Sequence, residues 1–185
     1  EIKGLAEQNL SRDPDFEIFL ELSRVMARHE LFLVATHVLS GVLPPLEAGR
    51  AHAAIAEALL RVVLRRTMAE LATRHGVVPG ARVAILGYGK LGSQEMTATS
   101  DLDLVIVYDA PPDEMSDGKR PLYASEWYAR LMQRLISALS TQMRNGSLYE
   151  IDVRLRPSGR KGPVAVSAAS FASYQQSEAE TWEHM

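Results

Sequence analysis

The chain has 185 residues, with 20 basic and 23 acidic side chains and a formal net charge of −3. A hydrophobic content of 46% and a charged content of 23% are typical of a globular protein, which excludes a disordered chain, and the charge balance argues against a general nucleic-acid binder. No apolar run approaches the roughly 20 residues of a membrane-spanning helix, and the absence of cysteine excludes disulfides and thiolate metal sites and favours a cytoplasmic protein.

The N-terminal part of the sequence predicts helices. Asp13 followed by Pro14 supplies a capping side chain and a first-turn proline, so a helix is expected to begin there. A second helical stretch, Leu31–Leu39, ends before a glycine and two prolines. A longer helix follows and is expected to end at Gly76. We therefore expect residues 1–78 to form a helical segment that acts as a spacer or a packing subdomain.

Residues 79–185 predict a sheet flanked by helices, which gives an α+β fold class. Short β-branched runs between glycine-rich turns predict three strands, Ala81–Leu86, Leu104–Tyr108 and Leu148–Leu155. Apolar residues at helical spacing predict two helices, Ala124–Arg144 and Ala168–Gln176, the second capped by Ser167. Because the chain begins with Glu1 and stops within a charged and aromatic segment, we expect a fragment truncated at its C-terminus.

A glycine-rich turn follows the first predicted strand. Its glycines, Gly87, Gly89 and Gly92, match the G-x-G-x-x-G pattern of dinucleotide-binding folds. That fold needs about a dozen or more residues to cross back over its sheet, and only Ser93–Ser100 are available, with a poor helical face. We therefore favour the other interpretation, a loop that approaches triphosphate oxygens closely and offers Ser93 as a hydroxyl donor.

Asp101 and Asp103 come directly after this loop, at the start of the second predicted strand. Because alternate side chains of a strand share one face, the two carboxylates are expected to point together while Leu102 and Leu104 enter the core. Two neighbouring carboxylates suit a hard divalent cation such as Mg²⁺. An Asp-x-Asp pair is also common in solvated turns, so the pair alone does not define a site.

A third carboxylate, Asp152, lies on the third predicted strand. Its expected strand face contains Glu150, Asp152, Arg154 and Arg156, and the residues between them are apolar. A solvent-exposed face has the same pattern. An acid between two arginines also suits phosphoryl transfer, because the acid completes a metal site or accepts a hydroxyl proton and the guanidinium groups bind phosphate. The joint occurrence of the glycine-serine loop, the Asp-x-Asp pair and this aspartate favours the catalytic interpretation.

Four segments carry a resemblance to a known family: GYGKLGSQEMTATSDLDLVIVY (87–108), DEMSDGKR (113–120), YEIDVRLRPSGRKGP (149–163) and TWEH (181–184). They resemble the nucleotidyltransferase superfamily, to which DNA polymerase beta belongs, and within it the glutamine synthetase adenylyltransferase family. The resemblance covers the chain from about Val83 to its end, and the helical part more loosely. It implies a mixed sheet flanked by helices. Ser93 stands where this family commonly has a second glycine, although serine is common there in the wider superfamily.

The resemblance implies transfer of AMP from ATP to a tyrosine hydroxyl of glutamine synthetase, which regulates nitrogen assimilation. Members of the family have two nucleotidyltransferase domains, one that attaches AMP and one that removes it by phosphorolysis. The motifs of this chain are closer to the attaching domain. The removing domain and a non-catalytic module that binds nucleotide or a regulator are the alternatives. The PII signal protein and glutamine are the implied effectors.

The resemblance also implies a role for each candidate residue. Asp101, Asp103 and Asp152 would hold two Mg²⁺ ions, and Asp152 would help to remove the tyrosine proton. Gly92 and Ser93 would hold the β- and γ-phosphates of ATP. The residues implied to counter the phosphate charge are Lys90, Arg154 and Arg156.

Overall fold

The computed structural model describes residues 15–111, 113–155, 157, 159 and 162–179. Its elements in chain order are α2 (Phe16–Leu39), α3 (Pro45–His75), β1 (Arg82–Tyr88), α4 (Gly89–Gly92), β2 (Leu102–Asp109), α5 (Ala124–Ser140), β3 (Ile151–Asp152), β4 (Ala165–Ser167) and α6 (Ala168–Ser177). These elements confirm the α+β fold class and the N-terminal helices. Within the described residues, no helix combines the length and the apolar character that a membrane span requires.

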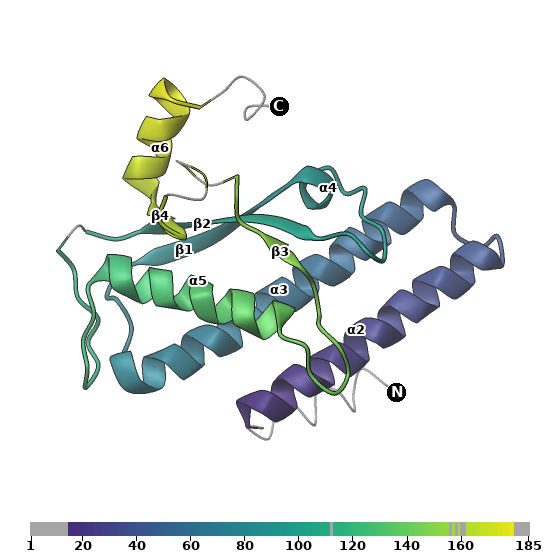
Figure 1. The fold of residues 1–185 in the computed structure, drawn as a ribbon, viewed down its shortest axis with the longest axis horizontal. Helices are drawn as coiled ribbons and strands as arrows, with labels where there is room; N and C mark the ends of the chain where they lie inside the picture. Colours follow the sequence, from purple (N-terminus) through teal and green to yellow (C-terminus); the bar gives the residue numbers. More distant parts are fainter. Residues whose placement is uncertain (1–14, 112, 156, 158, 160–161, 180–185) are drawn as a thin grey trace.

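Helices α2 and α3 lie side by side as a hairpin beneath the sheet (Figure 1). Helix α2 ends just before Gly41, whose φ is +73°, and Pro44 and Pro45 begin α3. Helix α3 is followed by Gly76, whose φ of +68° suits glycine and whose N–H donates to the Ala72 carbonyl at 2.8 Å. The predicted stretch Leu31–Leu39 is the C-terminal part of the single helix α2. The predicted start at Asp13 and Pro14 lies outside the described residues.

The sheet is mixed and is built around β2. Strand β1 pairs antiparallel with β2 along its whole length, from Arg82 opposite Asp109 to Tyr88 opposite Asp103. Strand β3 pairs parallel with the start of β2, and β4 pairs parallel with its end. Because β1 and β2 are antiparallel and joined by the four-residue helix α4, the parallel crossover of a dinucleotide-binding fold is absent from this connection.

The two faces of the sheet have different environments. Leu102, Leu104 and Ile106 of β2 are at most 1% exposed and enter one core with residues of α2, α3 and α5. Figure 1 shows α3 and α5 on this side and α6 on the other. Strand alternation places Asp103 on the face away from α3 and α5. The helices therefore leave the carboxylate face open at the start of β2.

Two predicted elements are longer than the observed ones, and two observed elements were not predicted. The third strand covers only Ile151–Asp152 instead of Leu148–Leu155, because the chain turns at residues 154–155. Helix α5 ends at Ser140 instead of Arg144, since Thr141 has an extended conformation and Arg24 of α2 binds the carbonyl groups at this helix end. The unpredicted elements are α4 and β4.

The loop between β2 and α5 is attached to the C-terminal end of α3. The Gly118 N–H donates to the His75 carbonyl, and the Val77 N–H donates to the Asp117 carboxylate at 2.8 Å. A Cβ atom on Gly76 would lie 2.2 Å from the Gly118 nitrogen, so this approach requires glycine. The DEMSDGKR segment is therefore held by backbone hydrogen bonds to the helical part of the chain.

Candidate active site

The strand register brings two of the predicted carboxylates together. Asp103 of β2 is the direct partner of Asp152 of β3, and because the strands are parallel and in register, both side chains lie on the same face. Asp101 is exposed and directly precedes β2, two residues from Asp103. Leu102 and Leu104 are buried, as predicted. Three acidic residues from neighbouring strands are thus gathered at one end of the sheet.

The electrostatic environment of Asp103 reflects this arrangement. Burial raises the pKa of the Asp103 carboxyl group, and the negative charges of Asp101 and Asp152 raise it further. The positive charge of Arg154 acts in the opposite direction. Asp101 and Asp152 therefore both repel the Asp103 carboxylate, and a cation placed beside Asp103 would relieve this repulsion.

Arg154 covers the carboxylate of Asp152. The Arg154 backbone N–H donates to Asp152 Oδ1 at 2.8 Å, its Nε donates to Oδ2 at 2.6 Å, and its Nη2 forms an ion pair with Oδ2. This hydrogen bond with Asp152 raises the pKa of Arg154. Among the described residues, no three His, Cys, Asp or Glu side chains form a ready-made metal cluster. The carboxylates are thus neighbours whose coordination set is not assembled.

A tight glycine turn lies against the carboxylates. Gly89 has a φ of +54°, and a Cβ atom there would lie 2.4 Å from Asp103 Oδ2. A Cβ atom on Gly92 would lie 2.8 Å from the Gly87 carbonyl oxygen, so the turn is also packed closely on itself. Gly89 thus makes room for the Asp103 carboxylate. The glycine pattern of the sequence predicts the turn but not this role of Gly89.

The remaining predicted ligand-binding residues lie on this turn or beyond β3. Lys90, Gly92 and Ser93 are exposed at the end of β1. The Ser93 N–H donates to the Gly89 carbonyl at 3.0 Å, and its hydroxyl donates to Glu95 at 3.2 Å. Arg156 lies outside the described residues. The structure thus places the loop and the acidic residues at the same end of the sheet.

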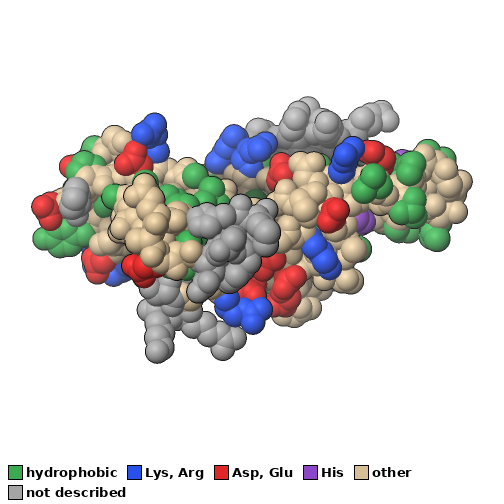
Figure 2. Space-filling model, turned by 90° about the horizontal axis from the view of Figure 1, so that it is seen from above, with side chains coloured by type: hydrophobic (Ala, Val, Ile, Leu, Met, Phe, Trp, Pro, Cys, Tyr) green, Lys and Arg blue, Asp and Glu red, His purple; other side chains and the backbone are tan. Residues whose placement is uncertain are grey.

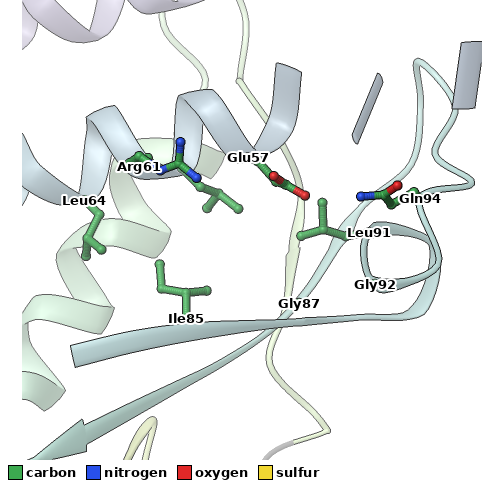
Figure 3. Close-up of a pocket in the computed structure, with 9 residues that line it drawn as sticks. Glu57, Arg61, Leu64, Ile85, Gly87, Leu91, Gly92 and Gln94 are labelled. Atoms are coloured by element: carbon green, nitrogen blue, oxygen red, sulfur yellow. The ribbon is translucent and has the colours of Figure 1, made fainter. Parts of the chain in front are cut away.

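A pocket of about 410 Å³ lies behind the glycine turn, between the turn and α3 (Figure 3). Its lining residues are Glu57, Leu60, Arg61, Leu64, Ile85, Gly87, Leu91, Gly92 and Gln94. Ile85 and Gly87 lie opposite Ile106 and Leu104 in the strand register, on the helix-covered face. The pocket is therefore separated from the carboxylates by the sheet.

Acidic and basic side chains alternate over the upper surface of the molecule, which Figure 2 shows from above. In the coloured part of this view, neither sign of charge forms an extended patch. This distribution agrees with the composition, which lacks the excess of basic residues of a general nucleic-acid binder.

Comparison with known proteins confirms the resemblance. The family model described as "Glutamate-ammonia ligase adenylyltransferase" matches residues 2–185. A bifunctional glutamine synthetase adenylyltransferase/adenylyl-removing enzyme of Brucella suis biovar 1 is 49% identical over 172 residues, which are 92% of this chain and 18% of that protein. The enzyme of the same name from Bradyrhizobium diazoefficiens is 45% identical over 186 residues, 100% of this chain and 19% of that protein.

The chain spans less than a fifth of the length of these curated relatives. Their similarity nevertheless extends over both the helical part and the sheet, because the family model covers nearly every residue. The relatives are named as adenylyltransferases, which are nucleotidyltransferase enzymes. The chain therefore belongs to the glutamate-ammonia ligase adenylyltransferase family.

Proposed function

We propose that this chain carries a catalytic centre that transfers AMP from ATP to a tyrosine hydroxyl of glutamine synthetase. The observation that supports this most directly is the register of β2 and β3, with Asp103 beside Asp152 and Asp101 two residues away. The glycine turn against Asp103 adds a surface for phosphate groups. The names of the relatives support glutamine synthetase as the protein substrate and adenylyl transfer as the reaction.

The donor set fits magnesium. Asp101, Asp103 and Asp152 offer only carboxylate oxygens, the ligands that Mg²⁺ prefers. Burial raises the pKa of Asp103, and the negative charges of Asp101 and Asp152 raise it further. In the proposal these three residues hold two Mg²⁺ ions. The ions would neutralise negative charge on the entering and leaving oxygens of an in-line displacement.

The other residues act on the nucleotide and on the attacking group. Gly92 and Ser93 bind the β- and γ-phosphates, Gly92 by allowing close approach of the phosphates and Ser93 through its hydroxyl. Asp152 accepts the tyrosine proton as the phenolic oxygen attacks the α-phosphorus and pyrophosphate leaves. The residues proposed to balance the phosphate charge are Lys90, Arg154 and Arg156.

Labelling of glutamine synthetase with α-phosphate-labelled ATP tests this proposal. Asp101→Asn and Asp152→Asn are each expected to reduce transfer roughly 100-fold or more, the scale on which loss of one preorganised electrostatic group acts. Asp109→Asn is the matched control, because Asp109 lies at the far end of β2 and pairs with Arg82. Wild-type labelling by Asp101→Asn or Asp152→Asn would refute the assignment, provided that Asp109→Asn is also active.

The direction of the reaction is tested separately. We propose the attaching direction because the DEMSDGKR (113–120), YEIDVRLRPSG (149–159) and TWEH (181–184) motifs resemble that domain. Incubation with adenylylated glutamine synthetase and phosphate, followed by measurement of ADP, detects the removing reaction. If ADP forms in this assay and the labelling assay shows no AMP transfer, the chain carries the removing reaction instead of the attaching one. Nucleotide binding without either reaction would favour a regulatory module.

Regulation belongs to the same proposal. The resemblance implies the PII signal protein and glutamine as effectors, and we assign neither to particular residues. Titration of each into the labelling assay tests them: a change in the transfer rate supports a regulator, and an unchanged rate excludes it for this chain.

A further inference from the structure

The ion pair between Arg154 and Asp152 occupies the same atoms that a metal ion would need. Asp152 Oδ1 accepts the Arg154 backbone N–H, and Oδ2 accepts Nε at 2.6 Å while also pairing with Nη2. The Asp152 side chain is only 13% exposed, and the Arg154 side chain is 62% exposed. The guanidinium group thus shields the solvent-accessible part of this carboxylate, and it can leave toward solvent.

We propose that Arg154 is a positioning residue that competes with the divalent cation for Asp152 and is released toward the triphosphate when the cation binds. This inference rests on the proposed function, because it assigns an order of events to the same site. Arg154 pairs with Asp152 before the ligands bind, and afterwards its charge is available to phosphate oxygens. Arg154 therefore couples metal binding to nucleotide binding.

The charges around the site support this exchange. Arg154 is the cation that offsets the negative charges of Asp101 and Asp152 on Asp103. Three carboxylates and one guanidinium leave an excess of negative charge, so a divalent cation is attracted even while Arg154 is present. Once such a cation binds, its repulsion acts on the guanidinium at close range. Because the Arg154 side chain is 62% exposed, water can solvate the guanidinium group when it leaves Asp152.

Two other roles for Arg154 make different predictions. If Arg154 binds only phosphate, its replacement weakens nucleotide binding and leaves the metal affinity in the absence of nucleotide unchanged. If Arg154 only maintains the turn after β3, its replacement weakens the binding of both metal and nucleotide. Only competition predicts that replacement of Arg154 changes the two affinities in opposite directions, with tighter metal binding and weaker nucleotide binding.

The experiment measures Mn²⁺ binding to the full chain by electron paramagnetic resonance, without nucleotide, and ATP binding by calorimetry without metal. Arg154→Gln is expected to bind Mn²⁺ roughly three- to tenfold more tightly than wild type, since a competing cation is removed. Its affinity for ATP is expected to fall. Arg154→Lys keeps the charge but loses the fork of donors, so its affinities for Mn²⁺ and ATP should lie between those of wild type and Arg154→Gln.

Arg82→Gln is the matched control, because Arg82 is an exposed arginine on the same sheet that pairs with Asp109 at 2.7 Å, away from the carboxylates. Its Mn²⁺ affinity should equal that of wild type. Unchanged or weaker Mn²⁺ binding by Arg154→Gln would overturn the inference. Asp103→Asn tests the metal site of the proposed function independently of Arg154. If this variant binds Mn²⁺ as tightly as wild type does, the assignment of the metal site itself is wrong.

Discussion

Arg24 of α2 provides the most quantitative test of how the helical part is joined to the rest of the chain. Its guanidinium group is buried, with the residue 1% exposed, and it donates to the carbonyls of Leu20, Ala138, Thr141 and Gly146 at 2.7–3.0 Å. Three of these acceptors lie at the end of α5 and in the turn that follows it. This turn leads into β3, so Arg24 connects the helical part to the strand that carries Asp152.

Arg24→Met keeps most of the aliphatic volume and removes every donor. Three carbonyls outside α2 then lose a charged donor, although the Gly146 carbonyl keeps the Met143 N–H at 3.1 Å. A hydrogen bond to a charged group contributes about 1.5–3 kcal/mol. Removal of a desolvated positive charge offsets part of this loss, as the burial that lowers the pKa of Arg24 indicates. We therefore expect the free energy of unfolding to fall by about 3 kcal/mol.

Urea unfolding followed by circular dichroism measures this difference. Arg50→Met is the control, because Arg50 is an exposed residue of α3 that pairs with Glu47 one helical turn away. That substitution should change the free energy of unfolding by less than about 0.5 kcal/mol. A loss below about 1 kcal/mol for Arg24→Met would refute the claim that these hydrogen bonds join the two parts.

Two further substitutions test local features. Gly89→Ala should reduce Mn²⁺ binding and AMP transfer, because its Cβ atom would collide with Asp103 Oδ2. The control is Gly80→Ala, which imposes only backbone strain, because Gly80 has a φ of +68° and open space around it. Equal effects of the two substitutions on Mn²⁺ binding would contradict the collision. Tyr149 is 6% exposed, and its hydroxyl has no hydrogen-bond partner among the described residues, so Tyr149→Phe should leave stability unchanged or raise it by about 1 kcal/mol at pH 7. Burial raises the pKa of Tyr149 from 10.0 to about 12. The unfolded chain then loses this proton first, so wild type should lose about 1.4 kcal/mol per pH unit relative to Tyr149→Phe as the pH rises from 10 to 12; parallel pH profiles in chemical unfolding would contradict this.

Features encoded by local patterns were predictable from the sequence. The β-branched run Leu104–Tyr108 predicted the second strand, and alternation around Asp101 and Asp103 predicted that Leu102 and Leu104 enter the core; the structure confirms the strand and the burial of both leucines. The prolines before α3 and Gly76 after it defined that helix, because each restricts or releases the backbone at its own position. Such signals depend on neighbouring residues only.

Features that depend on distant contacts were not predictable. The end of α5 is bound by Arg24, which precedes its acceptor Thr141 by 117 residues, and no local pattern indicates such a partner. The third strand was predicted too long because its alternation continues past the point where the chain turns. That turn directs Arg154 back onto Asp152, so an arginine expected only to bind phosphate instead forms an ion pair.

A structure of the full chain with Mn²⁺ and a non-hydrolysable ATP analogue tests the central claim most directly, because anomalous scattering locates the metal independently of the protein. We predict Mn²⁺ bound to oxygens of Asp103 and Asp152, with Asp101 as a further ligand and the triphosphate against the glycine turn. Metal bound elsewhere with these three carboxylates unliganded, while the nucleotide is present, would contradict the account.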